Sequence, residues 1–309
     1  MATTRHLPKR TVGLDINDTH IAPSQLPFER NGKMCLEAAG WTARPKDADD
    51  HQLAATVRQV FKQAGINTSH VCTSLQSPSL VLRPFQHVRL TPSELAAALA
   101  LEAEEALQKP SIDIYLDWHM NQDSAAGKGR QEGVLVAAPR DEIERLLSVL
   151  ALADIFPSVV DAACMAVCNL YLELRDRPSV EHAICIVAFA NQRADIAVLW
   201  DDCTIFPRTV FSPSGNWDQE TAYLAESIDD TLKYHQFKLH RPPVDRMVLT
   251  GDIPRRDILV KRLREIVPLV SNWNPLSDIK IAKASLKTLI DGEAGALLTT
   301  SLGLALRRS

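Results

Sequence analysis

Apolar residues recur along the chain at two spacings, one typical of buried strands and the other typical of amphipathic helices. Short apolar runs bounded by turn residues predict strands in the first half of the chain, at residues 11–16, 33–41, 71–75, 79–90, 113–120 and 134–138. Apolar residues three and four positions apart predict helices between them, at residues 50–64, 91–108 and 140–153. The first half is therefore expected to interleave strands with helices.

Two of these helices carry clear end signals. Gly65 ends the first, because glycine readily adopts the left-handed backbone that closes a helix. Thr91, Pro92 and Glu94 form a capping box that starts the second. The strand before that helix is interrupted at Pro84, and a proline in a strand marks an edge or a place where pairing stops.

A polar linker, Arg175–Glu181, separates this half from a second one. The pattern there predicts strands and helices at residues 183–190, 194–200 and 203–211 (strands), 219–237 (helix), 246–249 (strand), and 256–267 and 292–306 (helices). Each half thus begins with strands and ends with helices. This repeated layout is typical of the actin and hexokinase type of fold, in which a nucleotide lies between the halves.

Composition narrows the function classes. The 309 residues include 34 basic and 38 acidic ones, a net charge of −4, which gives no support to nucleic acid as a partner. The N-terminus carries no apolar secretory segment and no run of 18 apolar residues occurs, so we expect no membrane insertion. The six cysteines are dispersed without zinc-like spacing, which predicts no metal site and favours a reduced, cytoplasmic compartment.

The stretch VGLDINDTHI, residues 12–21, has the outline of a phosphate loop, because an apolar strand ends in Asp15 and then turns sharply. A working loop carries glycine, serine and lysine, so that backbone N–H groups approach the phosphate. Here the turn carries Asn17 and Asp18, and an acidic side chain repels phosphate. These residues favour a strand with its turn over a catalytic loop.

Several stretches resemble, in the same order, the PilM proteins of type IV pilus assembly, which are actin-like relatives of the cell-division protein FtsA. They are VGLDI at 12–16, SLVLRPFQHVRLTPSELAAALALEAEEAL at 79–107, IYLDW at 114–118, VLVAAPRDEIERLLSVLALADIFPSVVDAACMA at 134–166, VDRMVLTG at 244–251 and LGLALR at 302–307. The resemblance covers most of the chain, and it rests on the order of the motifs because no single one is specific.

The resemblance implies an α/β chain with the duplicated fold of actin and FtsA, in two β-sheet-plus-helix halves. We place the first half at residues 9–178, with an inserted α+β subdomain at about 79–156, and the second at 179–309, with its C-terminal helix returning toward the first half. Few residues separate Phe211 from Val248, so the helical subdomain that the family carries there is expected to be reduced or missing.

In this family three glycine-bearing loops hold the nucleotide, and each loop departs from the pattern here. The positions that we assign to a degenerate nucleotide cleft are Asp15, Asn17, Ala188, Ala190, Gly251 and Asp252. Asn17 and Ala190 stand in place of glycines, Ala188 in place of a metal-organising aspartate, and Asp252 in a glycine run. Lost carboxylates remove Mg²⁺ ligands, and added side chains block the approach of the backbone. We expect no cofactor, while weak residual ATP affinity stays open.

The resemblance further implies a scaffold that binds the N-terminal cytoplasmic tail of a PilN-like inner-membrane protein and so joins the pilus assembly platform. The chain would be cytoplasmic and peripheral to the inner membrane through that partner, and the related type II secretion platform stays open as its system. We assign the docking surface to the strand before the second helix, at Leu80, Leu82, Arg83 and Phe85. Core packing of Phe85 and simple solvation of Arg83 are the competing interpretations.

Two other function classes stay open. An actin-like ATPase with a non-standard site is the main alternative to a pseudo-ATPase without enzyme activity. A sugar-kinase relative is less well supported, because neither a catalytic aspartate nor an intact phosphate clamp can be placed. No HExxH helix and no Gly-x-Ser-x-Gly elbow occurs, so the residues predict no hydrolase.

Overall fold

The computed structural model describes most of the chain, in two compact units. The residues described are 11–27, 34–68, 71–121, 129–175, 177–179, 181–191, 193–201, 204–212, 217–253, 256–283, 286 and 294–307. Unit 1 comprises residues 1–76, 146–174 and 274–309, and unit 2 comprises residues 77–145 and 175–273.

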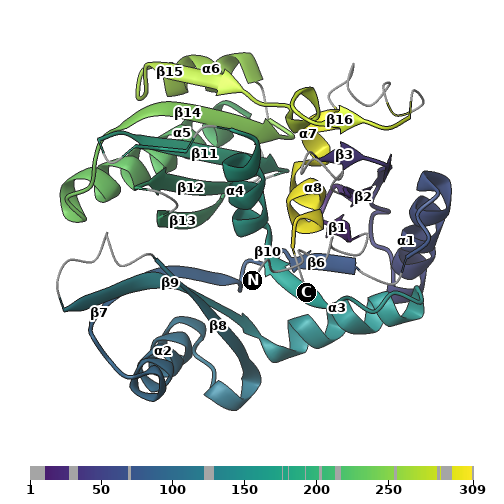
Figure 1. The fold of residues 1–309 in the computed structure, drawn as a ribbon, viewed down its shortest axis with the longest axis horizontal. Coiled ribbons are helices and arrows are strands. Elements are labelled where there is room, and N and C mark those ends of the chain that lie inside the picture. Colours follow the sequence, from purple (N-terminus) through teal and green to yellow (C-terminus); the bar gives the residue numbers. More distant parts are fainter. Residues whose placement is uncertain are drawn as a thin grey trace, which may run out of the picture. The chain divides into compact units, whose positions relative to one another are not determined.

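Unit 1 is built on a mixed six-stranded sheet, shown in purple to teal in Figure 1. Its order is β10-β6-β1-β2-β4, with β5 also beside β2, and its strands are β1 (Val12–Ile16), β2 (His20–Gln25), β4 (Ala38–Ala39), β5 (Thr42–Ala43), β6 (Val71–Leu75) and β10 (Val159–Ala162). β1 pairs antiparallel with β2 and parallel with β6, and β6 pairs parallel with β10. A separate short pair joins β3 (Cys35–Leu36) to β16 (Lys280–Ile281).

Side-chain alternation along β1 directs its two faces to different helices. Val12, Leu14 and Ile16 pack in one core with α1 (Asp50–Ala64) and the last turns of α3 (Arg140–Leu152). On the other face α8 (Thr299–Ala305) packs against β1, and α4 (Ala163–Leu174) packs against α8. A short helix, α7 (Ala294–Leu297), and a 3₁₀ turn (Pro275–Ser277) complete the described part of the unit.

Two glycines set the spacing of α8. A Cβ added at Gly13 would lie 1.8 Å from the backbone oxygen of Ser301, and one at Gly303 would lie 2.1 Å from that of Ala166. Both contacts are with backbone atoms that no side-chain rotation can move. The close approach of α8 to β1 and to α4 therefore requires glycine at both positions.

Unit 2 contains a second mixed sheet with five strands, which Figure 1 shows in teal and green. Its order is β13-β12-β11-β14-β15, with β11 (Ala183–Ala190), β12 (Arg193–Trp200), β13 (Thr204–Phe211), β14 (Val244–Gly251) and β15 (Leu269–Asn272). Two helices, α5 (Trp217–Lys233) and α6 (Arg256–Arg264), pack on one face and share its core. The core includes Val187, Ile196, Leu224, Leu249 and Leu259.

The remaining part of unit 2 is a three-stranded antiparallel sheet with one helix. Its order is β7 (Val81–Val88), β9 (Arg130–Pro139) and β8 (Ile114–Met120), and α2 (Pro92–Leu107) with a 3₁₀ turn (Ser111–Asp113) covers one face. This is the inserted α+β subdomain that the sequence predicts.

The two larger sheets share one topology. In each sheet an antiparallel hairpin (β1–β2, β11–β12) continues into two parallel strands (β6 and β10, β14 and β15). This repeat confirms the predicted duplicated α/β fold. The predicted halves, 9–178 and 179–309, each contain one of the duplicated sheets. The two compact units divide the chain differently, because the inserted subdomain belongs to the same unit as the second sheet. The predicted domain boundaries therefore stay a prediction.

Most predicted elements are present at nearly their predicted positions, and the capping boxes of α1 and α2 are both formed. The predicted strand at 33–41 is broken into short pieces, and Lys33 lies outside the described residues. The predicted C-terminal helix is divided between α7 and α8, and Gly292 is also outside them. Between Phe211 and Val244 the described residues form only α5 and one π-helical turn, Tyr234–Lys238, as expected for a reduced helical subdomain.

Candidate functional site

The first loop of the predicted nucleotide cleft is the tight turn between β1 and β2, in unit 1. Asn17 is buried there, and its side-chain oxygen accepts hydrogen bonds from the backbone N–H groups of Thr19 (2.9 Å) and His20 (2.8 Å) and from the Thr19 hydroxyl (2.9 Å). In a phosphate loop, free backbone N–H groups would point at the ligand. Here the side chain of Asn17 already occupies two of them.

The carboxylate of Asp15 is engaged in the same network. Asp15 is buried, and one of its oxygens accepts from the Asn17 amide at 3.1 Å and lies 3.5 Å from Nε2 of His20. The other oxygen accepts from the side-chain amide of Gln76. His20 Nε2 in turn lies 3.2 Å from the carbonyl oxygen of Leu297. The predicted phosphate-loop aspartate thus holds a turn together.

The second loop joins β11 to β12 in unit 2, where Ala188 and Ala190 are half-buried strand residues. Ala188 stands opposite Asp195 in the antiparallel ladder. Asp195 is a buried carboxylate that the sequence analysis missed, because a single aspartate inside an apolar strand carries no motif. It accepts from Arg193 at 2.8 Å and from the Thr209 hydroxyl at 2.7 Å, so it serves as an internal ion-pair residue.

The third loop follows β14, also in unit 2. Gly251 has a positive φ of 82°, and a Cβ there would lie 2.2 Å from the carbonyl oxygen of Phe189 on β11. The N–H of Asp252 donates to that same oxygen at 2.9 Å, and its side chain is exposed. Strand pairing alone therefore accounts for the glycine at position 251.

The predicted docking residues divide into core and surface. Phe85 is 5 % exposed and packs with Leu95, Leu99 and Leu135 in the core of the inserted subdomain. Phe85 alternates onto the α2 face of the sheet with Val81, so the packing interpretation is the one that its position favours.

The other three docking residues remain accessible. Leu80, just before β7, and Leu82, within it, are half-buried, and Arg83 is exposed. Arg83 forms no hydrogen bond or ion pair with any residue that the structure describes. Among the described strands β7 pairs only with β9, so it is the sheet edge that Pro84 predicts.

A cavity of about 690 Å³ lies within unit 2, between the inserted sheet and the five-stranded sheet. Leu82, Arg83 and Pro84 line one wall, and Phe206 and Arg208 of β13 line another. The sequence carries no signal for this cavity, because its walls come from strands far apart in the chain.

One buried ion pair crosses the cavity wall. Glu132 of β9 accepts two hydrogen bonds from Nη2 of Arg241, at 2.8 and 2.7 Å, and one from Gln86. The guanidinium of Arg241 also lies 5.1 Å from the ring centre of Trp200, a cation–π distance. Neither Glu132 nor Arg241 carries a sequence signal for this pair, because they lie 109 residues apart in the chain.

Behind this wall lies His235, a fully buried histidine in the π-helical turn. Its ring meets that of Trp200 edge-on, with centroids 4.8 Å apart, and neither ring nitrogen has a hydrogen-bond partner among the described residues. Burial, with a smaller contribution from the charge of Arg241, lowers the pKa of His235 to about 4. The imidazole is therefore neutral near pH 7.

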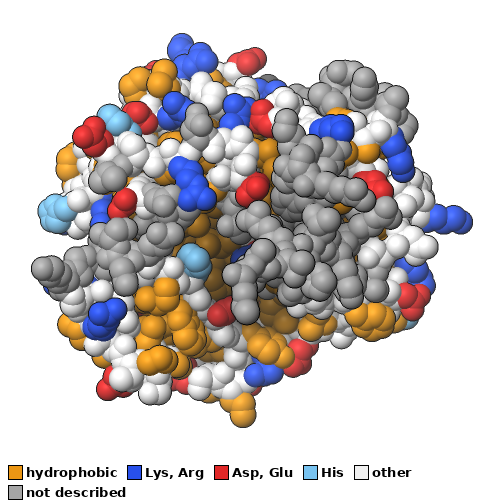
Figure 2. Space-filling view, in the orientation of Figure 1, with side chains coloured by type: hydrophobic (Ala, Val, Ile, Leu, Met, Phe, Trp, Pro, Cys, Tyr) orange, Lys and Arg blue, Asp and Glu red, His pale blue; other side chains and the backbone are white. Residues whose placement is uncertain are grey.

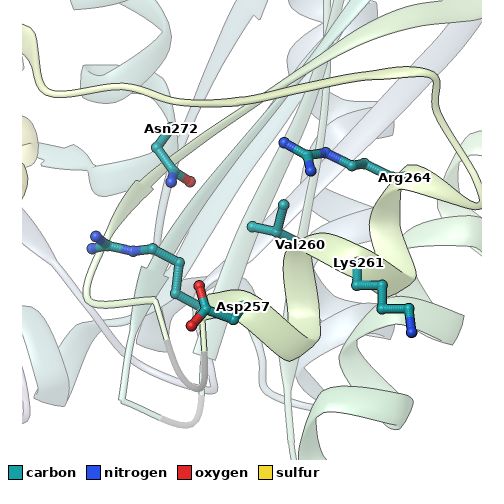
Figure 3. A pocket seen from close by; sticks show the side chains of 6 residues that line it. Asp257, Val260, Lys261, Arg264 and Asn272 are labelled. Carbon is teal, nitrogen blue, oxygen red and sulfur yellow. The ribbon is translucent and has the colours of Figure 1, made fainter.

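A second, smaller cavity of about 310 Å³ lies beside α6 and contains three basic side chains, Arg256, Lys261 and Arg264 (Figure 3). Figure 3 shows the ammonium of Lys261 directed away from Arg264 and Asn272, so the basic groups do not converge on one point. Elsewhere in the described residues no three His, Cys, Asp or Glu side chains gather as a metal site.

A family model that matches most of the chain identifies its family. The family model described as type IV pilus assembly protein PilM matches residues 13–213, which include β1, the inserted subdomain and the β11–β13 strands. The chain belongs to the PilM family of type IV pilus assembly proteins. This confirms the resemblance seen in the sequence, and no curated protein matches this PilM-family chain.

Solved structures place the PilM-family chain in the actin-like ATPase fold. A chain of the PilM–PilN type IV pilus biogenesis complex is similar over 97 % of this chain and 98 % of its own length, with a TM-score of 0.82 and 19 % identity. A Bacteroides thetaiotaomicron protein with an actin-like ATPase fold has a TM-score of 0.54, 12 % identity, and coverage of 94 % and 99 %. The cytoplasmic domain of EpsL, from the type II secretion system of Vibrio cholerae, has a TM-score of 0.50, 11 % identity, and 95 % coverage of both chains.

Proposed function

We propose that this PilM-family chain is a non-catalytic scaffold of type IV pilus assembly, which holds the N-terminal cytoplasmic tail of a PilN-like inner-membrane protein. The observation that carries the proposal is the whole-chain similarity to a chain of the PilM–PilN complex. The chain would reach the inner membrane through that partner. In the part of the chain that the structure describes, no helix is long and apolar enough to cross a membrane.

The first loop supports a scaffold without ATP hydrolysis. Its N–H groups at Thr19 and His20 are bonded to Asn17, and Asp15 is bonded to Gln76 and Asn17. A phosphate would have to displace this buried network and would meet no new lysine or glycine in return. The alanines at 188 and 190 supply no ligand for Mg²⁺.

The inserted subdomain offers the docking surface that suits such a tail best. Cytoplasmic segments next to a membrane span are enriched in lysine and arginine. α2 carries four glutamates and no basic residue, and His87 at the end of β7 lies 2.8 Å from Glu102 of α2. Val88 and Leu101 are each 67 % exposed, and Figure 2 shows apolar side chains gathered on the surface over α2. The tail would lie along β7 and α2, against apolar and acidic groups.

Fluorescence anisotropy with a labelled synthetic N-terminal tail of a PilN-like protein tests the proposal. We expect Leu101→Ser, which removes an exposed apolar side chain from α2, to weaken binding about tenfold through lost apolar contact. Glu105→Lys, at an exposed position on α2, should weaken tail binding severalfold and make the binding less sensitive to salt concentration. Arg83→Ala tests whether Arg83 bonds a carbonyl group of the tail.

Glu265→Lys makes the same charge change at an exposed position just after α6 and is the matched control, which should bind like the wild type. Phe85 is unsuitable for this test, because its truncation would disturb the core of the subdomain. Full tail binding by a folded Leu101→Ser, Glu105→Lys double variant would contradict docking on this surface.

A further inference from the structure

The cavity of about 690 Å³ in unit 2 is bounded by two edge strands. Among the described strands β7 pairs only with β9, and β13 pairs only with β12. Each edge carries a proline at the cavity, Pro84 opposite Val134 and Pro207 opposite Ala197. A proline is tolerated in an edge strand because its missing N–H falls on the open side. Each edge therefore lacks one backbone N–H donor on its open side. A peptide in the cavity would be held mainly by side chains and not by continuous strand pairing.

The charge of the cavity is strongly one-sided. Its described lining includes five arginine and lysine side chains and a single acidic one, Glu132, in a chain whose net charge is −4. Glu132 is already committed to Arg241. Lys238, like Arg83, makes no hydrogen bond or ion pair with the described residues. A low-dielectric wall behind a group of cations concentrates their field on an incoming anion.

Aromatic rings supply the apolar part of the lining. Tyr234, in the π-helical turn, is 49 % exposed and stacks on Phe206 of β13, with ring centroids 5.8 Å apart and planes at 22°. Both rings line the cavity, and Trp200 lies beside them under Arg241. Exposed tyrosine next to arginine is the composition that is enriched where protein surfaces bind partners.

We propose that this cavity binds an extended acidic segment of a second protein partner, in which carboxylates meet Arg208 and Lys238 and an apolar side chain meets Tyr234. A lysine- and arginine-rich tail of a membrane protein would be repelled by this charge, whereas the acidic surface of α2 suits it. The cavity is therefore a second docking site. With it the scaffold can hold its membrane partner and another component of the assembly machinery at the same time.

The test uses the full chain and a labelled heptapeptide of alternating glutamate and phenylalanine, with its lysine counterpart as the charge-reversed probe. We expect the acidic peptide to bind, with an affinity that falls as salt is raised, and the lysine peptide not to bind. The Arg208→Glu, Lys238→Glu double variant should weaken the acidic peptide at least about tenfold. Arg262→Glu, at an exposed position on α6 outside the cavity, should leave binding unchanged.

Thermal unfolding of each variant separates misfolding from lost binding, and Arg208→Gln, Lys238→Gln provides a milder second variant. Four results would overturn the inference. The acidic peptide could fail to bind the wild type or bind the double variant equally well. Pyrophosphate or ATP could displace the peptide at equal concentration, which would make the cavity a small-anion site. Finally, the double variant could lose the PilN-like tail, which would make the cavity the tail's own site while leaving the scaffold function intact.

Discussion

Single residues explain why β1 and the turn after it resemble a phosphate loop in sequence, although their polar groups are already hydrogen-bonded within the protein. Asn17 fills the turn with its own side-chain hydrogen bonds, and Asp15 is held by Gln76. The sequence predicted the chemical departures at these positions. It could not predict which groups replace the phosphate, because Gln76 lies far along the chain and reaches Asp15 only through the pairing of β1 with β6.

Gly13 provides the sharpest test of packing at this scale. In Gly13→Ala the new Cβ would fall 1.8 Å from the Ser301 oxygen, so α8 must shift away from β1. We expect a loss of about 3 kcal/mol in the free energy of unfolding, at the upper end of overpacking costs. Gly40→Ala, where the nearest atom is the Ala64 side chain at 3.2 Å, should cost under about 1 kcal/mol. Urea unfolding of both variants measures the difference, and equal stabilities would contradict this packing.

His235 makes a prediction about pH. Its pKa is lowered to about 4 in the folded chain, so between about 6.5 and about 4 the unfolded state binds a proton that the folded state does not. Stability should therefore fall as the pH falls through this window, by about 3 kcal/mol for the full effect. His235→Phe removes this contribution, so its unfolding free energy should vary less between pH 7 and pH 4.5 than that of the wild type. An identical pH dependence in both proteins would exclude His235 as the cause.

Among the helices and strands, the sequence predicted the features that depend only on neighbouring residues, such as the start of a helix or the edge position of a strand. Thr91 and Glu94 predicted the capping box of α2, and Pro84 predicted the edge position of β7. The capping box of α1, at Asp49, was not predicted and is found only in the structure. β2 was missed, because its run HIAPSQ contains a proline and little alternation, although all six residues are buried. β15 was also missed, since four residues with mostly exposed side chains give no periodic pattern.

Thr91 tests whether the capping box of α2 stabilises the inserted subdomain. Its hydroxyl accepts from the N–H of Glu94, and the carboxylate of Glu94 accepts from the N–H of Thr91 at 2.8 Å. We expect Thr91→Ala to lower the free energy of unfolding by about 1 kcal/mol. Hydrogen exchange should quicken in the first turn of α2 before it does in β9. Unchanged exchange there would show that tertiary packing alone fixes the start of the helix.

For the whole molecule, the order of the elements carried more information than any single motif. The order of apolar runs predicted two halves that each begin with strands, and the resemblance implied the inserted subdomain and the reduced segment between β13 and β14. The structure contains the duplicated sheets, and the family match over residues 13–213 covers the inserted subdomain but ends where the reduced segment begins. The cavity beside β7 could not be predicted in this way. Its cations, such as Arg83, Arg208 and Lys238, come from three distant segments, and only the folded chain brings them to one place.

The central claim is that this PilM-family chain binds a PilN-like tail as a scaffold and has no need of nucleotide. Calorimetric titration of the synthetic tail into the chain, with and without millimolar Mg-ATP, tests it most directly. We expect the tail to bind with the same dissociation constant in both solutions and ATP itself to produce no heat of binding. Absence of tail binding, or binding that appears or tightens at least about tenfold, equal to about 1.4 kcal/mol, only when Mg-ATP is present, would contradict it.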